Sequence, residues 1–154
     1  MTDYRSDLTA WSREQADALQ RRSANELDWE NIAEEIDSLG RQQQWELYNR
    51  LVVLVAHLLK WEFQADQRGR SWSTTILNQR FDIARQLKIS PSLKAAIDGE
   101  FAEAYPRGRL QAAQETRLSE RRFPDRAPFS LAQALDPDWL PGESDQSSIA
   151  SNGS

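Results

Sequence analysis

The chain has 154 residues and a formal net charge of −5, a length that suits one domain with one hydrophobic core. It contains no cysteine, which excludes disulfides, thiolate metal sites and cysteine nucleophiles. The start, MTDYRSDLTAWS, lacks a basic region followed by an apolar one, and no apolar run approaches the ~18 residues that a membrane span needs. We therefore expect a cytoplasmic protein without a membrane partner.

Apolar residues recur with helical spacing, and no segment alternates like a strand. The sequence therefore predicts an all-α fold, a single-domain helical bundle of four to five main helices with a long central helix. A first helix is expected over about residues 7–22. One side of this helix carries Leu8, Trp11, Gln15 and Leu19.

A second helix is predicted to start after Asp28, which is a good N-cap residue. Its apolar face comprises Trp29, Ile32, Ala33, Ile36 and Leu39. Gly40 either ends this helix or lies within a longer one, because the residues that follow it are good helix formers.

The third helix, predicted over about residues 42–64, is the expected centre of the bundle. Apolar side chains cover more than half of its circumference, which is typical of a helix packed on several sides. One polar stripe remains, consisting of Glu46, Asn49, Arg50, His57, Lys60 and Gln64.

A fourth helix is expected over about residues 72–88, with Ser71 as its cap. Ser90-Pro91 predicts a further helix start, and Pro106 is expected to kink or split that fifth helix. One or two helical turns follow over residues 130–135. We predict an all-helical domain over residues 1–140 and a disordered tail over residues 141–154, which are rich in Gly, Ser, Asp and Asn.

Several motifs of the chain occur together in a recognisable order. They are DWENIAEEI at residues 28–36, SLG at 38–40, HLLKW at 57–61, Ser71-Trp72 with Ile76, Gln79 and Arg80, and PSL at 91–93. From Tyr4 to Trp139 the chain resembles the bacterial family known as domain of unknown function 29. The resemblance implies an all-helical bacterial domain and no established activity.

A candidate polar cluster surrounds Arg80, which projects from the apolar stripe of the fourth helix. A buried guanidinium needs a carboxylate or an anionic ligand, and we expect Glu35 or Glu34 to supply the carboxylate. Ser73, on the same stripe, and His57, the only histidine, complete the cluster. A structural ion pair is our first interpretation, and an anion site is the alternative.

A second candidate site, for an anion or a partner, comprises Lys60, Arg68, Arg70, Ser71 and Trp72. Residues 60–94 carry seven bases against three acids, whereas residues 1–40 carry ten acids against four arginines. Packing of these two segments against each other would explain the asymmetry. A basic face for an anionic partner is the alternative, although the acidic chain argues against duplex DNA.

Six tryptophans follow the apolar faces and are interpreted as core. One histidine, no cysteine and no Glu-x-x-His motif predict no metal site, and we expect no cofactor. We predict a non-enzymatic binding or regulatory module that contacts a protein partner through the loop at residues 64–71. The alternative is a nucleic-acid or nucleotide-binding protein that uses the basic segment 60–88, and an enzyme with a Glu35, His57 and Arg80 cluster comes third. The oligomeric state stays open.

Overall fold

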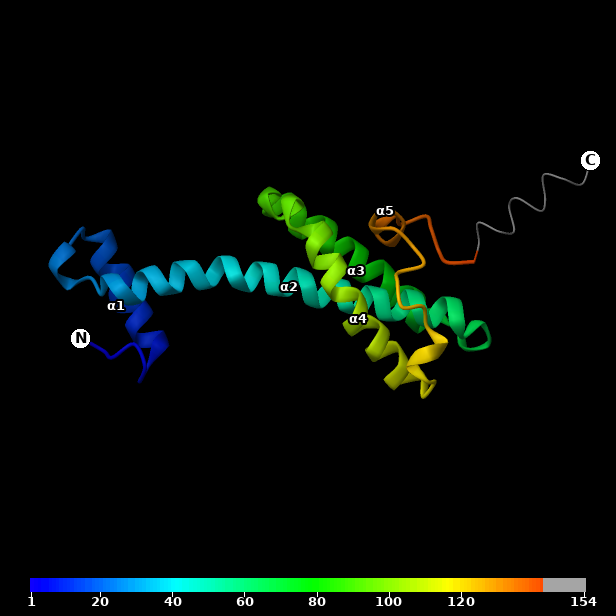
Figure 1. The fold of residues 1–154 in the computed structure, drawn as a ribbon. Coiled ribbons are helices and arrows are strands. Elements are labelled where there is room, and N and C mark those ends of the chain that lie inside the picture. The colour runs from blue at the N-terminus through cyan, green and yellow to red at the C-terminus, as the bar shows by residue number, and fades with distance from the viewer. Residues whose placement is uncertain (143–154) are drawn as a thin grey trace, which may run out of the picture. The chain divides into compact units, whose positions relative to one another are not determined.

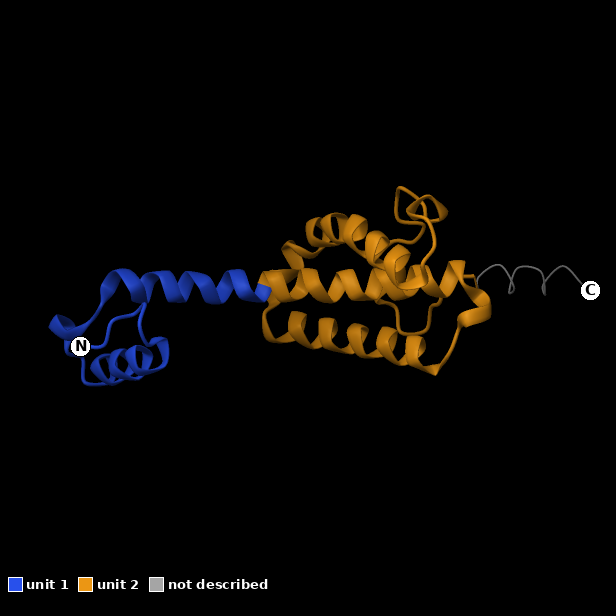
Figure 2. Ribbon diagram, turned by 90° about the horizontal axis from the view of Figure 1, so that it is seen from below, with its two compact units in different colours: residues 1–43 blue, residues 44–154 orange. Residues whose placement is uncertain are grey.

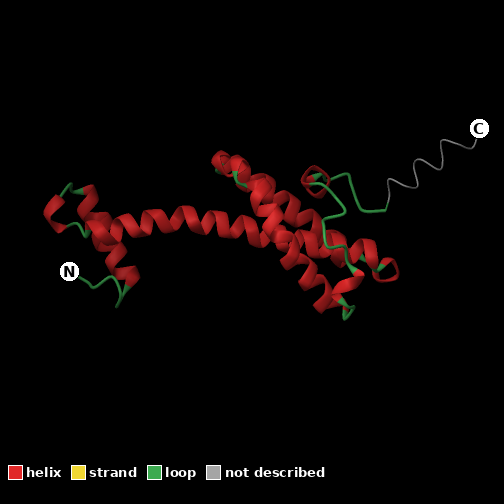
Figure 3. Cartoon of the chain, viewed as in Figure 1, coloured by secondary structure: helices red, strands yellow, loops and turns green. Residues whose placement is uncertain are grey.

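Helices account for all regular structure in residues 1–142, which are the residues that the computed structural model describes (Figures 1 and 3). The α-helices are α1 (Leu8–Gln20), α2 (Trp29–Phe63), α3 (Arg70–Ile89), α4 (Ile97–Thr116) and α5 (Leu131–Leu135). Short 3-10 helices are η1 (Ala24–Glu26), η2 (Ala65–Gln67), η3 (Pro91–Ala95) and η4 (Glu120–Arg122). The predicted all-α class is therefore confirmed.

The predicted second and third helices are one continuous helix, α2. It begins where predicted, because the Asp28 carboxylate accepts a hydrogen bond from the amide of Asn31 and caps the first turn. Gly40 lies inside α2, with open space around the position of an added Cβ. The helix-forming residues after Gly40 therefore outweigh its tendency to end a helix.

The contacts of the chain separate into two compact units, residues 1–43 and residues 44–154 (Figure 2). In the first unit, the buried residues are Trp11, Gln15 and Ala18, and hydrogen bonds hold two of them in place. The indole Nε1 of Trp11 donates to Asp28 Oδ2 at 3.0 Å, and Gln15 Oε1 accepts from the Asp28 amide at 2.7 Å. Tyr4 packs edge-on against Trp11, with ring centroids 4.8 Å apart. Hydrogen bonds thus join α1 to the start of α2, and the aromatic contact joins α1 to the segment that precedes it.

The second unit contains the hydrophobic core. The α2 side chains within it include six that are fully buried: Leu47, Leu51, Leu54, Val55, Leu58 and Leu59. Ile76 and Ile83 of α3, Ala104 and Ala112 of α4, and Phe123, Phe129 and Ala134 join the same cluster. The helix predicted over residues 42–64 therefore contributes the largest share of this core, as its expected central position implies.

Two local predictions differ from the structure. Ser71 does not cap the fourth helix, because α3 begins at Arg70 and Gly69 is its N-cap. Pro106 does not split the fifth helix, since α4 continues through it to Thr116. Pro106 is exposed, so water can solvate the carbonyl that loses its amide partner. Pro141, assigned to the tail, is buried, and residues 143–154 lie outside the described residues.

Tyr105 of α4 is buried, and its hydroxyl donates a hydrogen bond to the carbonyl of Pro124. Burial raises the pKa of Tyr105 to about 12, whereas an unfolded tyrosine titrates near 10. The unfolded state therefore loses this proton first, so stability is complete below about pH 10 and falls as the pH rises towards 12. We expect a loss on the order of 2 kcal/mol over this range, measured by urea unfolding at several alkaline pH values.

The variant Tyr105→Phe is expected to show a smaller alkaline loss than wild type, whereas Tyr48→Phe, which changes a half-buried tyrosine of α2, should retain the full loss. An equal alkaline loss in wild type and Tyr105→Phe would contradict the assignment.

Candidate functional site

Arg80 of α3 is 6% exposed, and its guanidinium meets the end of α5. Its Nε donates to the carbonyl of Ala134 at 2.8 Å, and its Nη2 donates to the carbonyl of Gln133 at 3.4 Å. A cation at the C-terminal end of a helix satisfies carbonyls that have no partner within the helix. Arg80 therefore fastens α5 to α3.

Within the second unit, backbone carbonyls hold Arg80, whereas the carboxylates expected to pair with it, Glu35 and Glu34, belong to residues 1–43. Within residues 1–142, Arg80 forms no ion pair, and its hydrogen bonds go to backbone oxygens. Glu35 accepts a hydrogen bond from the hydroxyl of Tyr4, which raises the pKa of Tyr4. Glu34 pairs with Arg41 at 2.9 Å. Backbone carbonyls took the place of the expected carboxylate because they too can accept from a guanidinium.

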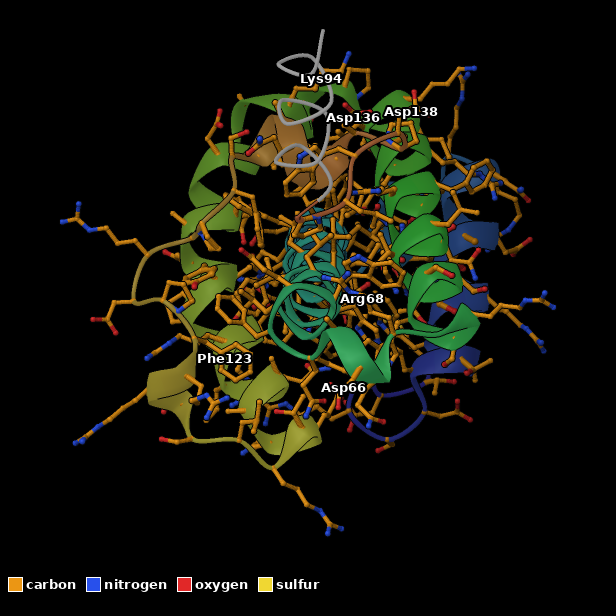
Figure 4. All side chains as sticks on the ribbon, turned by 90° about the vertical axis from the view of Figure 1, so that its right-hand side faces the viewer. Asp66, Arg68, Lys94, Phe123, Asp136 and Asp138 are labelled. Atoms are coloured by element: carbon orange, nitrogen blue, oxygen red, sulfur yellow. The ribbon has the colours of Figure 1, made fainter. Side chains whose placement is uncertain are left out.

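A small pocket of about 230 Å³ opens beside Arg80. Its lining consists of Ser73, Thr74, Ile76, Leu77, Arg80, Pro137 and Leu140. The structure thus brings Ser73 and Arg80 to one site, although the Ser73 hydroxyl itself donates to the carbonyl of Arg70. Burial lowers the pKa of Arg80, and the nearby charge of Asp136 opposes this effect. Figure 4 labels Asp136 and Asp138 on the segment that follows α5.

His57 is half-buried on α2 and does not line this pocket. Its Nδ1 lies 2.9 Å from the carbonyl oxygen of Val53. Burial lowers the pKa of His57, the hydrogen bond to Val53 opposes that shift, and the charge of Lys60 adds to it. The imidazole is therefore predominantly neutral at pH 7.

Lys60 belongs to the interior, although the sequence placed it on a polar stripe. Its ammonium donates to Glu115 Oε2 at 2.8 Å and lies 4.8 Å from the centre of the Trp72 ring. Partial burial is the largest single effect and acts to raise the pKa of Glu115. The hydrogen bond and the charge of Lys60, together with a hydrogen bond from Gln111, outweigh it, so the pKa of Glu115 is lowered. Lys60 is therefore already engaged by an acid and an aromatic ring.

The other members of the second candidate site lie around the connection between α2 and α3, where Figure 4 labels Asp66 and Arg68. Arg68 Nε donates to the carbonyl of Trp61 at 2.6 Å, and the guanidinium carbon lies 5.2 Å from the centre of the Trp61 ring. Arg70 and Ser71 are exposed. Trp72 of this candidate site and the nearby Trp61 therefore both already contact cations of this chain.

Exposed apolar side chains form a feature that the sequence analysis did not identify. On the part of α2 in the first unit, Trp29 is 63% exposed, Ile36 65% and Leu39 60%. The prediction that all six tryptophans belong to the core is wrong for Trp29 and for Trp45, which is also exposed. Helical spacing showed that Trp29, Ile36 and Leu39 share a face, but spacing alone does not show what covers a face.

Residues 1–142 contain no group of three or more His, Cys, Asp or Glu side chains placed to hold a metal ion. In the same range, no helix combines the length and the apolar character that crossing a membrane requires.

The fold and these sites define a class of small all-α protein with a buried arginine beside a pocket and an apolar helix face open to solvent. The chain belongs to the family described as Domain of unknown function DUF29, whose pattern matches residues 4–140. The resemblance found in the sequence motifs is thereby confirmed. No curated protein and no solved structure matches the chain.

Proposed function

We propose that this protein is a non-enzymatic binding module that docks a basic amphipathic helix of a partner protein. The docking surface, here called the α2 stripe, consists of Trp29, Ile32, Ile36 and Leu39. The observation that supports it is the exposure of three large apolar side chains on one helix face. This surface replaces the loop at residues 64–71 as the proposed contact, and a cytoplasmic location remains a prediction.

The spacing of the α2 stripe favours a helix as its occupant. Its residues follow one another at intervals of three, four and three positions, which is the spacing of the apolar seam in a coiled coil. Ala33 and Gly40 follow Ile32 and Leu39 directly in the chain, and an added Cβ at Gly40 would meet no atom within 4 Å. Small residues beside a seam leave room for a second helix to approach.

The size of the first unit also favours a partner. All 43 of its residues are described, and among them Trp11, Gln15 and Ala18 are buried. Domains of about 40 residues rarely form a sufficient core without a disulfide, a metal or association with another chain. If a partner buried it fully, each side chain of the α2 stripe would contribute about 1.5–3 kcal/mol to the free energy of binding.

Charge distinguishes a foreign partner from a second copy of this chain. Residues 1–43 carry ten acids against five arginines. Two copies docked through this unit would bring like charges together, whereas a helix with Lys and Arg beside its apolar seam would be attracted. We therefore infer a basic helix as the occupant.

The proposal can be tested with two fluorescently labelled peptides that have the same heptad leucines, one flanked by lysines and the other by glutamates. Anisotropy titrations with the full chain should show at least tenfold tighter binding of the basic peptide, and that binding should weaken with salt. The variant Ile36→Ala should weaken it about tenfold, as expected for an interface residue worth more than 1 kcal/mol.

Ile89→Ala is the matched control, because Ile89 is also an isoleucine and is 68% exposed on α3. Its affinity for the basic peptide should stay within twofold of wild type. Equal affinity for the two peptides, or equal losses in both variants, would contradict the proposal. Self-association that Ile36→Ala abolishes in sedimentation experiments would identify a second copy as the occupant instead.

A further inference from the structure

We propose that the pocket beside Arg80 binds a small organic monocarboxylate with a short aliphatic tail. The site lies in residues 44–154, whereas the α2 stripe lies in residues 1–43. This inference therefore goes beyond the proposed function and does not depend on it.

The positive charge of the pocket comes from Arg80. Its two hydrogen bonds engage Nε and Nη2 and are made to backbone carbonyls, which carry no formal negative charge. Within residues 1–142, Nη1 donates to no protein atom and no acid lies within ion-pair distance. A guanidinium has five N–H donors, so donors remain for an anion at this position.

The contacts with α5 hold the guanidinium ready for such an anion. Because Ala134 and Gln133 fix two of its nitrogens, Arg80 loses little conformational freedom when a ligand arrives. The structural role of Arg80 and the proposed binding role therefore use different N–H groups of one side chain.

The walls of the pocket indicate what else the anion carries. Thr74 offers a hydroxyl group, whereas the proton of the Ser73 hydroxyl is already donated to the carbonyl of Arg70. The other lining residues, Ile76, Leu77, Pro137 and Leu140, are apolar. A volume of about 230 Å³ corresponds to about eight molecules of liquid water at ~30 Å³ each. A carboxylate headgroup followed by a short aliphatic chain fits this combination of one cation, one free hydroxyl and apolar walls.

The charge of Asp136 acts on Arg80, so a bound anion experiences both the attraction of Arg80 and the repulsion of the Asp136 carboxylate. Both effects double for a doubly charged phosphate, and charge alone therefore does not separate the two ligands. The apolar side chains of the lining favour the carboxylate, because phosphate has no apolar group to place against them.

The test is a titration of the full chain with acetate, butyrate and hexanoate. Binding is monitored through the NMR signals of the α3 backbone and of the Arg80 Nε–H. Butyramide and inorganic phosphate are the reference compounds. We expect affinity to rise two- to fourfold for each added methylene. Butyramide should bind at least tenfold more weakly than butyrate, because it lacks the charge that strengthens hydrogen bonds to Arg80.

Two variants of α3 form a matched pair for the same titration. Leu77 lines the pocket and Phe81, one turn further along α3, does not, yet both are exposed, at 56% and 67%. Leu77→Asp should therefore weaken butyrate binding at least tenfold without unfolding the chain, while Phe81→Asp should change it less than twofold. Circular dichroism verifies that both variants remain folded.

Three results would overturn the proposal. The first is equal binding of butyrate and butyramide, since the charge of Arg80 would then have no role. The second is that phosphate binds as tightly as hexanoate and that the affinity for the three carboxylates does not change with chain length. The third is an equal effect of Leu77→Asp and Phe81→Asp, which would place the anion outside the pocket.

Discussion

Replacing Gly108 with alanine is expected to lower the free energy of unfolding by about 1–3 kcal/mol. Gly108 lies in α4, and a Cβ added there would come within 2.5 Å of Val55 Cγ1 and 3.0 Å of the carbonyl oxygen of Val52. Valine is branched at Cβ and has one strongly preferred rotamer in a helix, so it cannot turn aside cheaply. Helices α2 and α4 would have to move apart, and urea denaturation measures the cost.

Gly99 provides the control within the same helix. An added Cβ at Gly99 meets no atom within 4 Å, so Gly99→Ala should stabilise the chain by about 0.5–1 kcal/mol through helix propensity alone. If Gly108→Ala were stabilising to the same extent, the close approach of α4 to α2 at this position would be refuted.

Truncation of Leu54 to alanine is expected to lower the free energy of unfolding by about 2–5 kcal/mol. Leu54 is fully buried in the core of the second unit, where the loss of its methyl groups leaves a cavity. Chemical denaturation of the purified variant should show a lower midpoint with an unchanged slope, because the surface exposed on unfolding is nearly the same.

Leu39 is the same residue type on the same helix but is 60% exposed. Leu39→Ala should change the free energy of unfolding by less than about 0.5 kcal/mol. It should nevertheless lower the affinity of the chain for the basic peptide of the binding test. Comparable destabilisation by both truncations would mean that the α2 stripe is covered within the free protein, and would also remove the main support for its role in docking.

Local sequence signals predicted the helices well. Asp28 and Ser130 were followed by helices as expected, and Ser130 forms a reciprocal capping box with Gln133. The start of α3 was misplaced because glycine and serine are both acceptable N-caps, so composition did not decide between Gly69 and Ser71. The continuity of α2 through Gly40 was left open for a similar reason, since glycine both ends helices and occurs within them.

The contacts of the site depended on non-local packing and could not be predicted. The burial of Arg80 followed from its position on an apolar stripe, but its acceptors are backbone carbonyls more than fifty positions away. Every residue has a carbonyl, so no residue type marks such a partner. Lys60 likewise pairs with Glu115, 55 positions away, and its burial was missed because its neighbours on the helix wheel are polar.

The small interior of the first unit affects how the protein should respond to heat. The heat-capacity change of unfolding comes mainly from apolar surface that becomes hydrated, and exposed polar surface reduces it. Within residues 1–43, Trp11 and Ala18 are the buried apolar residues, so this unit has little apolar surface to release. Calorimetry therefore reports chiefly on the leucine-rich core of residues 44–154, and melting of residues 1–43 adds little to the signal.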